Sequence, residues 1–179
     1  MEITIREIDA QTLQYVNRSD NSFIVKSQLL INAENGRISY SVIDVPPYMK
    51  RYQPDEIDYA TYISNPEKTV YFAFVQGDLA GQIRVLNWWN AYAYIGSIVV
   101  DRKYRRQGVG QALIERVVDW AKAKGYPGLM LETQNNNVPA CRLYERCGFV
   151  LGGFDGYLYK GLNPATDDIA LYWYLLFEG

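Results

Sequence analysis

The chain has 179 residues, and its 18 Lys and Arg against 20 Asp and Glu give a formal net charge of -2, a balance that gives no reason to expect general nucleic-acid binding. No apolar run approaches the roughly 18 residues that span a membrane, and the first residues, MEITIREIDA, lack the apolar segment of a secretory signal. The sequence has no histidine, which excludes a Ser-His-Asp triad and a histidine-ligated metal. We therefore expect a cytoplasmic protein that binds no nucleic acid, no membrane and no metal.

The first fifty residues alternate apolar and polar side chains, a pattern typical of half-buried strands. The predicted strands cover Ile3–Ile8, Phe23–Leu30 and Arg37–Val45. A turn over 32–36 joins the second to the third, and its Asn35-Gly36 pair is typical of a tight hairpin. We expect Pro46-Pro47 to end this hairpin, because proline lacks the N–H that strand pairing needs. Residues 48–69 are polar and aromatic and predict a loop or a short helix.

A second hairpin and a long helix are predicted in the middle of the chain. The predicted strands cover Val70–Val75, Asp78–Leu86 and Ala91–Val100. Gln76-Gly77-Asp78 connects the first two tightly, which indicates a hairpin. Apolar residues then recur every four positions over 109–121, which predicts an amphipathic helix of about four turns. Gly125 is expected to end this helix at a C-cap position.

The last third of the chain predicts three more strands around a short helix. The predicted strands cover Gly128–Thr133, Phe149–Tyr159 and Ile169–Phe177. The short helix covers Pro139–Cys147, with Asn137 as a possible cap and Gly148 just past its end. We expect Gly152-Gly153 to bend or bulge its strand. Antiparallel hairpins with an embedded strand-helix-strand crossover predict a mixed α/β (α+β) fold, with a mostly antiparallel central sheet flanked by helices.

The segment most informative about chemistry is IVVDRKYRRQGVGQ, residues 98–111. It runs from a strand through a basic turn and two glycines into the long helix. The first amides of a helix lack backbone partners, and the helix dipole adds partial positive charge there. Gly108 and Gly110 let a phosphate approach the backbone closely. The segment therefore predicts a pyrophosphate site, and its basic residues are Arg102, Lys103, Arg105 and Arg106.

Two segments resemble the GCN5-related N-acetyltransferase (GNAT) family. Arg105-x-x-Gly108-x-Gly110 is similar to the acetyl coenzyme A signature of that family, and 137–149 is similar to its second conserved segment. Within the family, the chain resembles the streptothricin acetyltransferases from about Pro46 to its end. The resemblance implies a single GNAT domain over 1–179, as monomer or homodimer, with a variable substrate-side region over about 1–69 and an acetyl coenzyme A core over about 70–179. The residues that carry the finer likeness are Trp89-Asn90, Leu131–Gln134, Asn136–Cys141, Gly152–Asp155 and Leu171–Tyr174.

The resemblance also implies which residues bind acetyl coenzyme A. The end of the strand before the basic turn would pair its backbone with the pantetheine arm, and amides from Arg105 to Gly110 would hold the pyrophosphate. Asn137 and Tyr144 would lie near the pantetheine and the sulfur, and Ala140 shares a helix face with Tyr144 because the two are four residues apart. The expected coenzyme-binding residues are Ile98, Val99, Val100, Arg105, Arg106, Gln107, Gly108, Val109, Gly110, Gln111, Asn137, Ala140 and Tyr144.

The implied chemistry is acyl transfer from a thioester to an amine. Tyr144 is our candidate for the acid that protonates the leaving thiolate, and a core aromatic role is its alternative. The streptothricin enzymes that the chain resembles carry a Glu at the position of Gly96, and glycine can neither accept a proton nor attract a cation. Glu132 and Asp155 are the substitute carboxylates. Their alternatives are a structural hydrogen-bonding residue and a turn residue.

The expected acceptor is the primary amine of a small molecule of the streptothricin type. Another small amine, a protein lysine, or binding of acyl coenzyme A without turnover are the alternatives. Cys141 and Cys147 are expected to be buried thiols without a catalytic role, since no histidine is present to activate them. An aromatic wall is expected to bind the cation, and the expected substrate-binding residues are Tyr48, Tyr52, Trp89, Gly96 and Trp173.

Overall fold

The structure is a computed structural model that describes residues 1–178. The chain folds into two compact units, and each unit is assembled from separate stretches of sequence. The first unit contains Met1–Ser22, Arg51–Leu129, Phe177 and Glu178, and the second contains Phe23–Lys50 and Met130–Leu176. Between residues 1 and 178, no helix has both the length and the apolar character needed to cross a bilayer.

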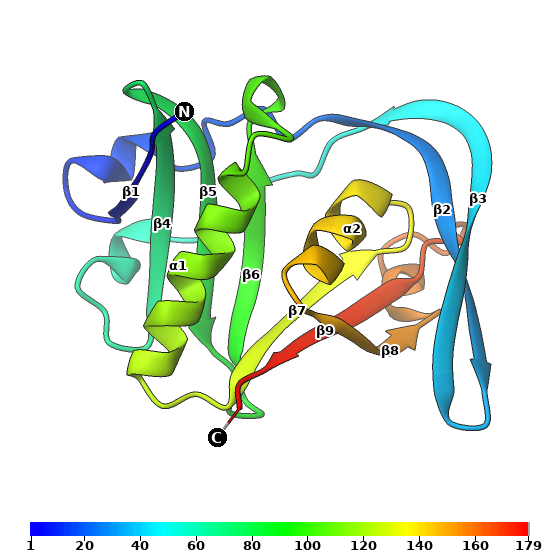
Figure 1. Cartoon of the computed structure of the whole chain (residues 1–179). Coiled ribbons are helices and arrows are strands. Elements are labelled where there is room, and N and C mark those ends of the chain that lie inside the picture. The colour runs from blue at the N-terminus through cyan, green and yellow to red at the C-terminus, as the bar shows by residue number, and fades with distance from the viewer. Residues whose placement is uncertain (179) are drawn as a thin grey trace. The chain divides into compact units, whose positions relative to one another are not determined.

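The first unit holds an antiparallel sheet with a helix across one face. Its strands lie in the order β1-β4-β5-β6, and the long helix α1 packs across β4 and β5 (Figure 1). Three short 3₁₀ helices connect these elements. The bounds are β1 Ile3–Glu7, η1 Thr12–Tyr15, η2 Tyr59–Tyr62, β4 Lys68–Val75, β5 Asp78–Asn87, β6 Ala93–Val100, η3 Arg102–Tyr104 and α1 Val109–Ala123.

Strand β4 is buried on both faces, which explains its continuous apolar sequence. Val70, Phe72 and Phe74 pack with Tyr59 and Tyr62 of η2 on one face. Successive strand residues point to opposite faces. On the other face the ring of Tyr71 therefore meets α1, where the guanidinium carbon of Arg116 lies 4.5 Å from the ring centroid. Burial on both faces makes this strand the centre of the first unit.

Tight turns lie where the sequence predicted them. Gln76 and Gly77 both adopt positive φ, 52° and 87°, so β4 and β5 form a two-residue hairpin. Gly125, with φ of 76°, follows the end of α1 as predicted. Both turns use backbone conformations that L-residues adopt rarely, and glycine supplies at least one position in each.

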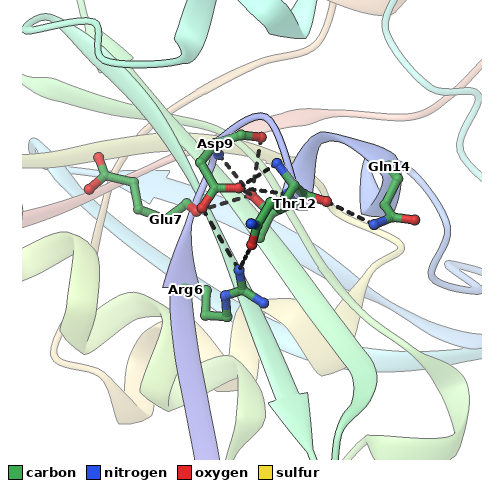
Figure 2. Close-up of polar contacts among 6 residues, drawn as sticks. Arg6, Glu7, Asp9, Thr12 and Gln14 are labelled. Carbon is green, nitrogen blue, oxygen red and sulfur yellow. Dashed lines mark hydrogen bonds and ion pairs between the residues drawn. The ribbon is translucent and has the colours of Figure 1, made fainter.

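The turn between β1 and η1 is fixed by the side chain of Asp9 (Figure 2). Its Oδ1 accepts from the backbone N–H of Gln11 at 2.8 Å and of Thr12 at 2.7 Å. Arg6 approaches the second carboxylate oxygen at 3.8 Å. The hydrogen bond from the Thr12 backbone is the largest cause that lowers the pKa of Asp9. The contacts are local and anchor the first strand to the helical turn that follows.

The second unit contains a long hairpin, a short sheet and a helix (Figure 1). Strands β2 and β3 pair antiparallel around Asn35 and Gly36, which have φ of 50° and 75°. The remaining strands lie in the order β7-β9-β8, with β8 and β9 antiparallel. The bounds are β2 Phe23–Glu34, β3 Arg37–Lys50, β7 Gly128–Gln134, α2 Val138–Arg146, β8 Val150–Asp155, η4 Leu158–Gly161 and β9 Ala170–Leu176. Together with the first unit, these elements confirm the predicted mixed α/β fold.

The prediction that Pro46-Pro47 ends the first hairpin is wrong. β3 continues through both prolines to Lys50, which pairs with Phe23. The register shifts between Val25 and Ser27, so the prolines pass a β-bulge. The two strands form a sheet of their own, and each is an edge strand. Bulges and edge strands are the places where a sheet tolerates proline.

The strand predicted over Phe149–Tyr159 is too long, because β8 covers only Val150–Asp155. Asp155 ends it: its Oδ1 accepts from the backbone N–H of Tyr157 at 2.7 Å and of Leu158 at 3.1 Å, which starts a 3₁₀ turn. The bulge expected at the glycine pair is confirmed by a register shift between Leu151 and Gly153.

Candidate functional site

The N-terminus of α1 presents free backbone donors. Gly108 is its N-cap, and no side chain caps the helix. The first hydrogen bond of the helix runs from the N–H of Ala112 to the oxygen of Gly108. Within residues 1–178, the amides of Val109, Gly110 and Gln111 therefore donate to no acceptor, and no acidic residue lies in the first turn. Three free N–H groups and the positive end of the helix dipole favour an anion here.

The backbone at this helix end is open and shaped for close approach. Gly108 has φ of 85°, and a Cβ built there would meet only the Cδ1 of Ile3, at 4.0 Å. Two residues earlier Arg106 also adopts positive φ, 60°, which is uncommon for a residue with a side chain. Alternating backbone handedness of this kind turns successive N–H groups toward one side of the loop. The geometry suits a bound phosphate.

The four basic residues of the loop divide into two kinds. Arg105 is structural: Nε donates to the oxygen of Val100 at 3.0 Å, and Nη1 and Nη2 donate to the oxygens of Ser22 and Asp20 at 2.7 and 3.0 Å. Lys103 pairs with Asp78 at 3.4 Å. The other two, Arg102 and Arg106, are exposed and make no ion pair or side-chain hydrogen bond among residues 1–178. The charge available to a phosphate therefore comes from Arg102 and Arg106.

Both glutamines of this segment have side chains occupied by the protein. Gln107 Nε2 donates to the oxygen of Lys103 at 3.1 Å, and Gln111 Nε2 donates to Glu115 Oε1 at 2.8 Å, one helical turn on. One N–H of each side-chain amide is therefore engaged by the protein. The preceding strand end, 98–100, pairs with 81–83 of β5. Gly81 is required there, because a Cβ would lie 2.6 Å from the oxygen of Val99.

In the second unit, α2 carries the next group of predicted residues. Asn137 caps the helix as predicted, with Oδ1 accepting from the N–H of Ala140 at 3.3 Å. Tyr144 lies one turn after Ala140 and is only 4% exposed. Its ring packs against Phe149 and Trp173, with centroids 5.8 and 6.1 Å away. The Tyr144 ring thus has the packing expected of a core aromatic residue.

The two candidate carboxylates have different surroundings. Glu132, on β7, has an Oε1 that is buried and has no hydrogen-bond partner among residues 1–178. Burial raises the pKa of Glu132 to about 7. Asp155, by contrast, holds two backbone amides in the turn after β8. An unpaired carboxyl that titrates near neutral pH has the property of a general base, whereas Asp155 has the contacts of a turn residue.

Among residues 1–178 the two cysteines form no disulfide. Cys141 is buried and Cys147 is partly buried. Burial raises the pKa of the Cys141 thiol to about 12, so the reactive thiolate is scarce at neutral pH. Cys141 therefore has the character expected of a structural cysteine, whereas Cys147 is less buried than predicted.

The predicted substrate residues differ widely in exposure. Trp89, in the β5–β6 turn, is 86% exposed, and Tyr48, on β3, is 47% exposed, with its hydroxyl accepting from Asn136 Nδ2 at 3.3 Å. Tyr52 is partly buried. Trp173 is 1% exposed and packs against Tyr40 and Tyr144 in the core of the second unit, so the structure does not place it on an exposed aromatic wall. Trp173 is therefore a core residue of the second unit.

Gly96 lies at a bulge in β6 and packs against the side chain of Arg84. Arg84 was not among the site residues predicted from the sequence. Arg84 of β5 pairs with Ser97 and Val85 pairs with Ile95, so Gly96 has no partner in the register. A Cβ built on Gly96 would lie 2.6 Å from the guanidinium carbon of Arg84. The signal available in the sequence was a charged residue inside a largely apolar strand, AGQIRVL.

A strand, a basic loop and an uncapped helix define a protein that binds a phosphate-bearing ligand. The model of the Acetyltransferase (GNAT) family matches residues 37–149. The chain belongs to this family. Within residues 1–178, no group of three or more His, Cys, Asp and Glu is placed to hold a metal ion.

Three similar proteins indicate which members of the family this chain resembles. Streptothricin acetyltransferase A of Bacillus subtilis (strain 168) is 35% identical over 90% of this chain and 92% of its own length. Streptothricin acetyltransferase of Escherichia coli is 38% identical over 95% and 92%. A crystal structure from Bacillus anthracis str. Ames, of a candidate streptothricin acetyltransferase in complex with acetyl coenzyme A, is 46% identical, covers 99% of both chains and superposes with a TM-score of 0.92.

Proposed function

We propose that this protein transfers the acetyl group of acetyl coenzyme A to a primary amine of a streptothricin-type antibiotic, and so confers resistance in the cytoplasm. The names of two relatives support the acceptor, each at 35% identity or more over at least nine-tenths of this chain. The acetyl coenzyme A complex of the 46% identical structure supports the co-substrate. Because the family match at 37–149 includes parts of both units, we propose that the two units form one acetyltransferase domain.

The free amides at the N-terminus of α1 are the observation that carries this proposal. The diphosphate of a coenzyme fits them, because Val109, Gly110 and Gln111 offer donors without acceptors and Gly108 leaves the approach open. Arg102 and Arg106 add charge that no carboxylate of the described chain neutralises. Arg105 contributes by fixing the loop, and its side chain does not itself bind phosphate in this account.

Acetyl coenzyme A supplies a thioester, whose carbonyl carbon an amine attacks as the carbon–sulfur bond breaks. Glu132 is the proposed base: Oε1 accepts the proton that the ammonium group must lose to become a nucleophile. A carboxyl with a pKa of about 7 is partly ionised at neutral pH and is matched to this transfer. Tyr144 is the proposed acid, and its hydroxyl donates a proton to the departing sulfur. The contacts of Asp155 with the Tyr157 and Leu158 amides leave it the weaker candidate for the base.

Mass spectrometry tests reaction and acceptor together. A streptothricin mixture is incubated with the protein and acetyl coenzyme A, and each component is expected to gain one acetyl group. Release of free thiol is followed in parallel with a panel of small amines and a lysine peptide. Calorimetric binding of acetyl coenzyme A without thiol release on any amine would contradict the proposal, because a binding module shows that behaviour.

A further inference from the structure

The bulge at Gly96 is filled by a side chain of the neighbouring strand. Arg84 lies so close to Gly96 that a Cβ there would meet the guanidinium carbon and Nη2 at 2.6 Å and Nη1 at 2.8 Å. Real Cβ atoms do not tolerate such contacts, so any larger residue at 96 requires Arg84 to move. The position of the Arg84 guanidinium therefore depends on having glycine at position 96.

The guanidinium of Arg84 is buried and only partly satisfied by the protein. Its side chain is 9% exposed. Nη2 donates to Asp55 Oδ2 at 2.8 Å, and Nη1 donates to the hydroxyl of Tyr62 at 3.2 Å. Nε is buried and has no partner among residues 1–178. A buried donor left without an acceptor points to an oxygen supplied by a bound molecule or by water.

Asp55 is the exposed member of this pair. Its side chain is 58% exposed, and only Oδ2 is engaged by Arg84, so Oδ1 is available to a ligand. Two further acidic residues, Glu56 and Asp58, follow within three positions. The buried arginine thus holds an exposed carboxylate in one orientation, within a locally acidic segment. Preorganised carboxylates of this kind recognise ammonium groups.

Arg84 and Gly96 lie near the end of β6, the segment that the proposed function assigns to coenzyme binding. Gly96 precedes Ile98 by two residues, which is about 7 Å along a strand. An amine anchored at the bulge is therefore within reach of a thioester carried by 98–100. We infer that Asp55 binds the ammonium group of the acetyl acceptor and that Arg84, seated on Gly96, is the residue that positions Asp55. The inference rests on the proposed function, because it concerns the acceptor of that reaction.

Steady-state kinetics with streptothricin and acetyl coenzyme A test this assignment. Asp55→Asn is expected to raise the KM for streptothricin at least tenfold and to leave the KM for acetyl coenzyme A within twofold. Asp55→Glu, which keeps the charge, is expected to recover part of the loss. Glu56→Gln is the matched control: it removes one negative charge from the position next to Asp55, the carboxylate that pairs with Arg84, and both KM values should stay within twofold.

The role of Arg84 is tested by two further variants. Gly96→Ala pushes the guanidinium away from Asp55 and is expected to raise the KM for streptothricin in the same direction as Asp55→Asn. Arg84→Lys keeps the positive charge but places its donors on a single nitrogen, so it is expected to have an intermediate KM. This variant provides a readout if the alanine variant does not fold. An unchanged KM for streptothricin in both variants overturns the positioning role.

Two outcomes separate this inference from the proposed function. If the parent protein acetylates streptothricin and Asp55→Asn behaves like Glu56→Gln, the inference is overturned and the proposed function stands. If the parent protein acetylates no streptothricin, the proposed function fails, and the inference fails with it.

Discussion

Arg105 donates a hydrogen bond from Nε to the backbone oxygen of Val100, at 3.0 Å. Val100 is the last residue of β6, so this contact ties the loop before α1 to the strand that precedes it. Two further donors of Arg105 hold the oxygens of Ser22 and Asp20. The family signature therefore places an arginine here for the shape of the loop, and the free amides that follow depend on that shape.

Replacing Arg105 should disturb binding through structure. We expect Arg105→Ala to weaken acetyl coenzyme A binding at least tenfold by calorimetry and to lower the Tm, because three backbone oxygens lose their donor. Arg106→Ala is the matched comparison, since Arg106 is exposed and its side chain makes no ion pair or hydrogen bond within residues 1–178. Its loss should keep the Tm and weaken binding only a few-fold, less so at high salt. An equal salt-sensitive loss without a change in Tm for both variants would contradict the structural role of Arg105.

The two ends of α1 provide a second matched pair. Gly108 and Gly125 both adopt positive φ, 85° and 76°, and neither has an atom closer than 4.0 Å to a built Cβ. Alanine at either position should cost about 1 kcal/mol of stability, which is roughly 2–4 °C in Tm. Only Gly108→Ala should also weaken acetyl coenzyme A binding, because its methyl group faces the approach to the free amides. Equal affinities of the two variants would argue against a phosphate at this helix end.

Much of the fold was predictable because local signals agree with the tertiary structure. The four-residue spacing of apolar side chains over α1, Gly125 after its end and Asn35-Gly36 in the hairpin each predict one conformation, and packing confirms it. The prediction that Pro46-Pro47 ends the hairpin was wrong, because a strand tolerates proline when it lies at the edge of a sheet or passes a bulge. Sequence does not show that β3 is an edge strand.

The parts of the candidate site that are formed by backbone amides were predictable from the sequence. The parts that depend on side-chain contacts were less predictable. Gly108 and the helix that follows indicate free amides directly. Arg105 donates hydrogen bonds to three backbone oxygens, and the guanidinium of Arg84 packs directly against Gly96. These contacts join residues that lie up to 85 positions apart in the sequence. No short-range pattern encodes such contacts. Glu132 and Asp155 also differ in environment: Oε1 of Glu132 is buried without a partner among residues 1–178, whereas Asp155 accepts hydrogen bonds in a turn. The sequence alone does not reveal this difference between two carboxylates.

Glu132 should make the protein less stable as pH rises. Its pKa in the folded protein is about 7, above its ordinary value of 4.5. Below pH 4.5 the carboxyl is protonated in both folded and unfolded chains and has no effect, and above pH 7 the folded state carries the full cost of a buried charge. Glu132→Gln should therefore raise the Tm at pH 8 and leave it nearly unchanged at pH 4. In the same variant turnover should fall at least tenfold, with loss of the pH–rate limb near 7. A parental pH–rate profile would remove Glu132 as the base.

The acid role of Tyr144 is tested by removing one oxygen. Tyr144→Phe keeps the packing of the ring against Phe149 and Trp173 and removes the hydroxyl. Turnover should fall at least tenfold while the KM for acetyl coenzyme A stays within a few-fold. Tyr126→Phe, at a ring stacked on Trp120, is the control and should retain full turnover. Parental turnover in Tyr144→Phe would assign that ring to the core alone.

A crystal structure of the protein with coenzyme A tests the central claim most directly. We expect diphosphate oxygens at about 2.7–3.1 Å from the backbone nitrogens of Val109, Gly110 and Gln111, with the side chains of Arg102 or Arg106 turned toward them. A coenzyme bound elsewhere, with those amides facing only water, would contradict it.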